Sequence, residues 1–122
     1  MDICIVTSYL VDKLAKIKGK KAFQKLIYLS KAVGVPVDGN YKMYYYGPYS
    51  EQVADALEHC VCSNILAKDE SSYNYYAGKK QKEFLEKNKS DLDKIKERLD
   101  FVIEEFGDCD PMELEILSTT HF

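Results

Sequence analysis

The fold of this chain is decided by residues 40–50, Asn-Tyr-Lys-Met-Tyr-Tyr-Tyr-Gly-Pro-Tyr-Ser, which hold half of its ten tyrosines around one Gly-Pro pair. Aromatic and long side chains alternate over residues 41–46, which is the period of a strand. Gly47 and Pro48 are expected to end this strand. Alternation would turn the row of Tyr41, Met43 and Tyr45 toward the core and leave Tyr44 and Tyr46 facing outward.

Helices are predicted on both sides of this stretch. Ser50 is placed to cap a helix that runs to about Ser63, because its hydroxyl can accept a bond from an orphaned backbone amide. Before the stretch, apolar residues recur at helical spacing from Ile3 to Ile17, and Gly19 is a plausible stop for this amphipathic helix. A second, lysine-rich helix follows, and Gly34 with Pro36 ends it.

Two short strands and two helices are predicted after residue 63. The strands cover 65–67 and 73–77, and a polar turn over 68–72 joins them in a hairpin. A long helix is expected over 79–106, with Asn88 as the one polar member of its apolar seam. The other seam residues are Leu85, Leu92, Ile95, Leu99, Val102 and Phe106. Such a seam can pack along the domain or form a homodimer through Leu85, Leu92, Ile95, Leu99 and Val102, and both alternatives stay open.

The last helix has the clearest local start signal. Asp110 as N-cap, Pro111 at the first helical position and Glu113 form a variant of the capping box, which predicts a short helix over 110–122 whose apolar side includes Leu114 and Leu117. The order of elements predicts a single domain over 1–122. We expect a mainly α fold with a small antiparallel β element, winged-helix-like, with a long C-terminal helix.

Composition indicates a globular protein with uneven charge. With 122 residues and 46% hydrophobic residues, the chain is expected to form one core. It has no apolar run long enough for a membrane span and does not begin like a secretory signal, so we predict a cytoplasmic protein. The net charge is −3 overall, yet residues 1–34 carry seven lysines against two acids.

Candidate chemistry is sparse. The four cysteines lack the spacing of a disulfide framework, so free thiols are expected. Cys60 and Cys62 beside His59 do not predict a metal site, because residues two apart on a helix point about 200° from each other. The chain contains two histidines, no Gly-rich phosphate loop and no nucleophile elbow. We predict no enzyme, no metal and no cofactor, and a small enzyme using His59 or His121 is the rival hypothesis.

The charge of the third helix argues against nucleic acid. Residues 50–64 would form the recognition helix of a winged-helix protein, yet they include Glu51, Asp55 and Glu58 and no lysine or arginine. Contact with phosphates depends on cationic side chains. The chain has one arginine, Arg98. The lysine-rich second helix keeps a winged-helix DNA-binding transcription regulator as the alternative.

Tyrosine favours a protein partner instead. Eight of the ten tyrosines lie between Tyr41 and Tyr76. Tyrosine offers large, fairly rigid contact area with a polar tip and is enriched at the centres of protein interfaces. Packing of these rings on each other as cross-strand pairs is the structural alternative, and both roles can hold at once.

Three segments carry a family resemblance. Residues 23–29, Phe-Gln-Lys-Leu-Ile-Tyr-Leu, and residues 46–50, Tyr-Gly-Pro-Tyr-Ser, resemble the helix motif and the Tyr-Gly-Pro turn of the SocA-like antitoxin (Panacea) domain. Residues 114–122, Leu-Glu-Ile-Leu-Ser-Thr-Thr-His-Phe, are similar to the C-terminal segment of the YwgA-like bacterial proteins of that group. Relatives often continue past this segment, which leaves open a truncated chain or a compact branch.

The resemblance implies a small cytoplasmic prokaryotic or phage protein without catalysis. Members act as antitoxins that bind a partner toxin, or as an adaptor that presents a toxin to a protease. We therefore predict a non-enzymatic protein-binding module of toxin-antitoxin or phage-conflict type, acting by sequestering or presenting a partner protein. The predicted partner-binding residues are Gln24, Lys25, Tyr28, Tyr44, Tyr46, Gly47, Pro48, Tyr49 and Ser50.

Overall fold

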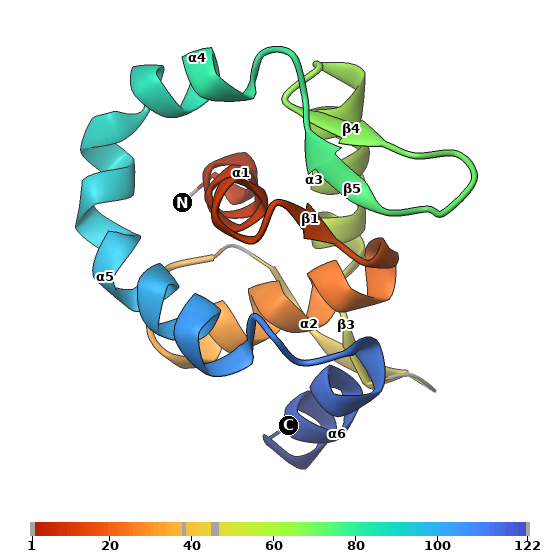
Figure 1. Ribbon diagram of the computed structural model, residues 1–122. Helices are drawn as coiled ribbons and strands as arrows, with labels where there is room; N and C mark the ends of the chain where they lie inside the picture. Colours follow the sequence, from red (N-terminus) through yellow and green to blue (C-terminus); the bar gives the residue numbers. More distant parts are fainter. Residues whose placement is uncertain (1, 38, 45–46, 122) are drawn as a thin grey trace.

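Helices supply most of the structure, a computed structural model that describes residues 2–37, 39–44 and 47–121, apart from the side chains of Tyr44, Pro111 and His121 (Figure 1). The helices are α1 (Ile3–Leu14), α2 (Gly19–Ala32), α3 (Glu51–Cys62), α4 (Gln81–Lys87), α5 (Lys89–Phe106) and α6 (Pro111–His121). The strands are β1 (Lys16–Ile17), β2 (Lys42–Tyr44), β3 (Gly47–Tyr49), β4 (Leu66–Lys68) and β5 (Tyr75–Ala77).

A three-stranded antiparallel sheet gives the chain its winged-helix topology. The strand order is β1-β5-β4, with Tyr76 of β5 opposite Lys16 of β1 and Ala67 of β4. One strand between the first two helices thus pairs with a hairpin that follows α3, as in winged-helix domains. The predicted fold class and the 65–77 hairpin are confirmed.

The end of the first helix was predicted wrongly. The helix stops at Leu14 because Ala15 takes a positive φ of 70°, which turns the chain out of the helix and into β1. Gly19 is the first residue of α2 rather than a stop. The apolar spacing continues to Ile17 because Ile17 is buried in β1, so helical periodicity alone did not reveal the change of structure.

The Tyr-rich stretch forms a second, two-stranded sheet of β2 and β3. Gly47 and Pro48 pair with Tyr44 and Met43, so they lie within a strand and do not end one as predicted. Proline is tolerated there because a two-stranded ribbon leaves an edge free of partners. Residues 45–46 lie outside the described part of the chain, which leaves Tyr45 and Tyr46 without a structural test. Met43 is 44% exposed, so the predicted inward row is not inward at this position.

α1 lies at the centre of the molecule. Every residue from Ile3 to Val11 is buried, and Figure 1 shows α1 end-on, with α4, α5, α2 and α3 around it. A helix that is buried on all sides must be enclosed on all sides. The prediction of an amphipathic first helix was therefore wrong, since Thr7 and Ser8 are buried along with the apolar residues.

The predicted long helix over 79–106 is two helices. Asn88 interrupts it, with its backbone N–H and its side-chain Nδ2 both donating to the carbonyl of Phe84, at 3.1 and 2.9 Å. The break lets α4 and α5 wrap around α1. Within α4, Gln81 is buried and donates a 3.0 Å hydrogen bond to the carbonyl of Ser8 in α1.

The apolar seam of α5 packs inside the molecule. Leu92, Ile95, Leu99 and Val102 are buried in the common core, and Leu85 of α4 is half-buried against it. The intrachain alternative is therefore the one that the structure has, because these side chains leave no apolar face for a homodimer. Arg98 donates a 2.8 Å hydrogen bond to the carbonyl of Gly34, which ties α5 to the end of α2.

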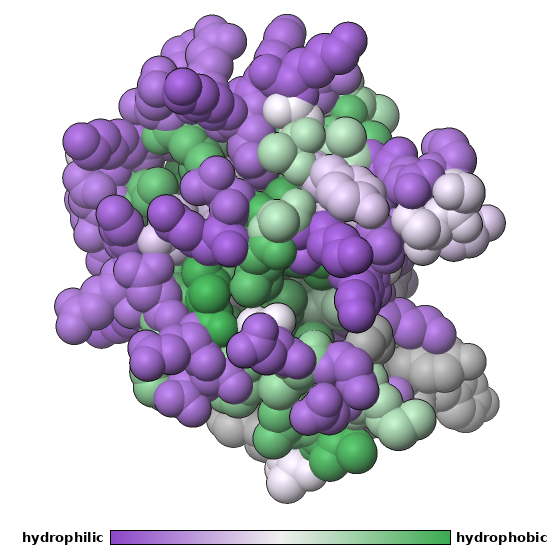
Figure 2. Space-filling view, viewed as in Figure 1, coloured by the Kyte–Doolittle hydropathy of each residue, from purple (hydrophilic) through white to green (hydrophobic). Residues whose placement is uncertain are grey.

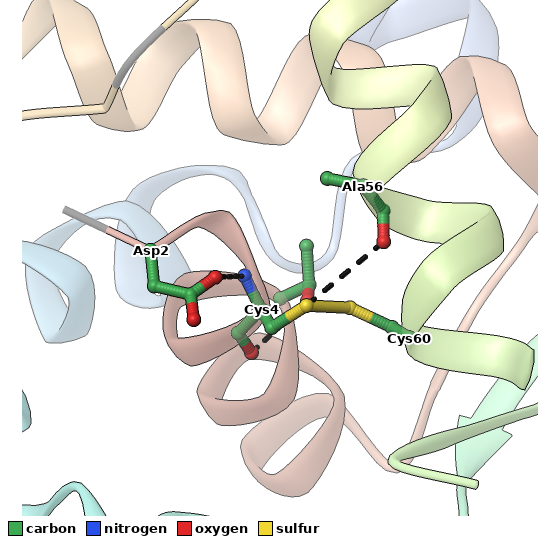
Figure 3. Close-up of a disulfide and its surroundings, with 5 residues drawn as sticks. Asp2, Cys4, Ala56 and Cys60 are labelled. Carbon is green, nitrogen blue, oxygen red and sulfur yellow. Dashed lines mark hydrogen bonds between the residues drawn. A yellow bond between two sulfur atoms is a disulfide. The ribbon is translucent and has the colours of Figure 1, made fainter. Parts of the chain in front are cut away.

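A disulfide joins the first turn of α1 to the last turn of α3 (Figure 3). It links Cys4 and Cys60, which are separated by 56 positions, while Cys62 and Cys109 are free. The prediction of free thiols was wrong for the bonded pair, because only folding brings these two helices together. Asp2 caps α1 beside the bond, accepting from the backbone N–H of Cys4 at 2.9 Å. None of the helices in the described ranges is long and apolar enough to span a bilayer.

Reduction of the disulfide is expected to destabilise the protein. A bond that closes a loop of this length stabilises the folded state by roughly 2–4 kcal/mol, mainly by restricting the unfolded chain. Urea unfolding with and without dithiothreitol should show a lower midpoint in the reducing series. The Cys4→Ser, Cys60→Ser variant should have the same urea midpoint as the reduced protein, and dithiothreitol should not change that midpoint. Alkylation of all four thiols without prior reduction would contradict the bond.

Candidate functional site

The two sequence motifs meet through a pair of hydrogen bonds between Gln24 and Ser50. Gln24 Nε2 donates to the Ser50 carbonyl at 2.8 Å, and the Ser50 N–H donates to Gln24 Oε1 at 3.0 Å. Both residues are buried. The carboxamide of Gln24 thus pairs with the backbone of Ser50 as another peptide group would, and it joins α2 to the end of β3.

Ser50 also begins α3, as predicted. Its hydroxyl accepts from the backbone N–H of Val53 at 3.4 Å and donates to Gln52 Oε1 at 3.0 Å. The N-cap satisfies one of the free donors at the start of the helix. A single residue therefore links α2, β3 and α3.

The contact of α6 with α2 and β3 is centred on Lys25 and Gly47. A Cβ placed on Gly47 would lie 3.1 Å from Thr119 Oγ1 and 3.4 Å from Ser118 Oγ, both in α6, and 3.5 Å from Cε of Lys25. Gly47 also has a φ of +101°, in the region that side chains disfavour. The glycine of the Tyr-Gly-Pro motif is thus required by its backbone conformation and by the approach of α6. We refer to Lys25, Gly47, Leu114 and Ser118 as the α6 contact.

Lys25 is almost completely covered within the α6 contact. It is 2% exposed, and its Nζ donates to the carbonyl of Lys21 at 3.4 Å. Burial lowers the pKa of Lys25, and the carboxylate of Glu115 in α6 opposes this by favouring the charged form. Burying an ammonium group is costly without a partner. The attraction between the Glu115 carboxylate and the Lys25 ammonium group therefore favours the packing of α6 against α2.

The start of α6 carries the predicted capping box. The backbone N–H of Glu113 donates to Asp110 Oδ1 at 2.8 Å, and the N–H of Asp110 donates to Glu113 Oε1 at 3.3 Å. Leu114 and Ser118 form the buried side of the helix. Leu117, predicted on the apolar side, is 41% exposed.

More than half of the predicted partner-binding residues lie inside the molecule. Gln24, Lys25, Gly47, Pro48 and Ser50 are buried. The reason is that glutamine, glycine and proline in these two motifs meet the needs of a tight internal junction as well as those of a binding surface.

Two of the four tyrosines of the predicted site are half-buried, and the side chains of the other two are not described. Tyr28 is half-buried and stacks edge-on against Tyr41, with ring centroids 5.1 Å apart. Tyr49 is also half-buried. The side chain of Tyr44 and all of Tyr46 lie outside the described residues, so an outward tyrosine row stays a prediction.

The exposed side of α3 is acidic, as the sequence indicated. Glu51, Asp55 and Glu58 are all exposed. Glu51 and Asp55 also line a cleft of about 280 Å³, shared with Lys42 and Tyr49 of the two-stranded sheet. Where a winged-helix protein would present its recognition helix, this chain presents carboxylates.

The outer side of α6 was missed by the sequence analysis. Met112 and Ile116 are 71% and 61% exposed, the highest values among the large aliphatic residues of the described chain. The four-residue spacing of Met112 and Ile116 places them on one side of the helix, whereas the predicted apolar side was that of Leu114 and Leu117.

Over the described part of the chain, His, Cys, Asp and Glu form no group of three that could hold a metal ion.

Replacement of Gln24 by leucine should destabilise the fold. Gln24→Leu leaves the buried N–H of Ser50 without a partner and removes one of the two hydrogen bonds that the Ser50 carbonyl accepts, the other coming from the N–H of Ala54. The expected cost is about 3 kcal/mol in the free energy of unfolding. Chemical denaturation measures the loss. Gln52→Leu is the matched control, because Gln52 is exposed, and it should cost under about 1 kcal/mol. Equal losses in both variants would contradict the role assigned to Gln24.

Alanine at Gly47 should loosen α6. In Gly47→Ala the new methyl group combines a positive φ with close contacts to atoms of α6. In Gly19→Ala the φ is also positive, at +92°, but the new methyl group has no atom within 4 Å. Both variants are expected to lose about 1–3 kcal/mol from backbone strain. Only Gly47→Ala should also accelerate amide hydrogen exchange within α6. Unchanged exchange there would show that α6 does not depend on the close approach at Gly47.

Comparison of the chain with protein-family models, with curated proteins and with solved structures gives no match. The resemblance to SocA-like antitoxin domains therefore rests on the three quoted segments alone, and it stays a prediction.

Proposed function

We propose that this chain is a cytoplasmic, non-enzymatic protein-binding module of toxin-antitoxin or phage-conflict type, which sequesters or presents a partner protein. The observation that carries the proposal is the placement of α6. Residues of both sequence motifs seat this helix on α2 and β3, and the helix holds Met112 and Ile116 out in solvent. Exposed aliphatic side chains held on a well-anchored helix are typical of a protein-binding surface.

Electrostatics supports a protein partner over DNA. The exposed carboxylates of α3 would repel phosphates, and the one arginine of the chain bonds the carbonyl of Gly34. The alternative, a winged-helix DNA-binding regulator, is favoured by the sheet topology and by exposed lysines around β1. These lysines are Lys13, Lys16, Lys18, Lys20 and Lys21.

The two functions predict opposite results for a charge reversal beside β1. Tagged protein from its native host is expected to co-purify with one other protein in fixed stoichiometry, and Lys16→Glu with Lys18→Glu should leave that protein bound. A DNA-binding regulator would instead retard operator DNA at low salt and lose this binding in the same variant. Recovery of no stoichiometric protein, together with retarded DNA, would overturn the proposal.

A further inference from the structure

α6 is apolar on two opposite sides. Leu114 faces the core and is 2% exposed, whereas Met112 and Ile116 are exposed to solvent. At about 100° per residue, Met112 and Ile116 both fall within about 20° of the point opposite Leu114. We refer to Met112 and Ile116 as the outer strip. A helix that only covers a core carries polar residues on its outer side, so the outer strip departs from what packing within this chain requires.

Hydrophobic residues gather on the surface over α6. Figure 2 shows hydrophobic atoms gathered at the lower edge, where Figure 1 draws α6. Side chains four residues apart on a helix are neighbours, so Met112 and Ile116 form one continuous ridge. Phe101 on α5 is also exposed, at 49%, but it stands among Asp93, Lys96, Glu97, Asp100 and Glu104 without a second apolar residue. A single exposed apolar residue is common on protein surfaces.

The charge around the outer strip is negative. Residues 107–121 contain Asp108, Asp110, Glu113 and Glu115 and no lysine or arginine. On the helical wheel Glu113 and Glu115 lie on opposite flanks of the strip, each about 80° from its centre. Glu115 is partly balanced by the nearby charge of Lys25. The carboxylate of Glu113 accepts a hydrogen bond from the N–H of Asp110.

We infer that the outer strip docks a cationic amphipathic helix of the partner protein, an inference that rests on the proposed function. Leucine-like side chains of such a helix would cover Met112 and Ile116, and its flanking lysines or arginines would meet the carboxylates on either side. Complementary potentials of this kind favour the correct partner and speed association. The helix-in-groove and helix-on-helix modes of recognition use the same i, i+4 spacing of apolar anchors.

Other occupants fit the outer strip less well. Two copies of α6 packed together would oppose glutamates with glutamates. The lysine-rich surface of a second copy would match the charge, but residues 2–34 expose no large hydrophobic side chain that could cover the strip. Anionic lipid and nucleic acid would both be repelled by the flanking carboxylates.

Two synthetic peptides of about 18 residues test the inference directly. One carries leucines at i, i+3, i+4 and i+7 with lysines between them, and the other has glutamate in place of every lysine. Fluorescence anisotropy should show at least about tenfold tighter binding of the lysine peptide, and higher salt should narrow the difference. Met112→Ser with Ile116→Ser should weaken the lysine peptide by about tenfold or more without lowering the thermal midpoint.

Phe101→Ser is the matched control, because it removes an exposed apolar residue from another acidic helix. Its affinity for the lysine peptide should equal that of the unmodified protein. Equal binding of both peptides, or an equal loss in the Phe101→Ser variant, would overturn the inference. Light scattering that shows a dimer abolished by Ile116→Ser would also overturn it, by assigning the strip to a second copy.

Capture from the native host separates this inference from the proposed function. If the unmodified protein retains a stoichiometric partner and the Met112→Ser, Ile116→Ser variant retains it equally, the outer strip is not the docking site although the protein-binding function stands. If no protein is retained at all, the proposed function itself fails.

Discussion

The rest of the structure depends on the burial of α1 over residues Ile3 to Val11. A helix whose residues from Ile3 to Val11 are all removed from water needs neighbours on every side. α3, α4, α5 and β5 supply these neighbours, and the interruption at Asn88 allows α4 and α5 to follow the curve around α1. The seam of α5 is used for the same purpose, which is why it serves the core and not a dimer.

The buried pair of Gln24 and Ser50 extends this arrangement outward. It fixes the end of β3 against α2, and from there Ser50 begins α3 while Gly47 admits α6. The carboxamide of Gln24 tolerates no apolar replacement, because the buried N–H of Ser50 would be left without an acceptor. The residues that attract attention in the sequence are thus those on which the placement of α6 depends.

The molecule combines a buried junction around Gln24 and Ser50 with an α6 that exposes Met112 and Ile116. The carboxylates of α3 and of the α5–α6 region make these surfaces poor partners for phosphate. Protein binding is the role that we propose, and α6 combines a buried side packed on α2 and β3 with the exposed Met112 and Ile116.

Local signals in the sequence were enough for the mainly helical fold with its hairpin after α3, for the Ser50 cap, for the capping box at Asp110 and for the acidic side of α3. Each of these depends on residues within a few positions of one another. The sequence did not reveal β1, the bond between Cys4 and Cys60, the pairing of Gln24 with Ser50 or the exposure of Met112 and Ile116. These features depend on which distant segments lie side by side, and burial in the folded chain decides that, whereas spacing along the sequence does not.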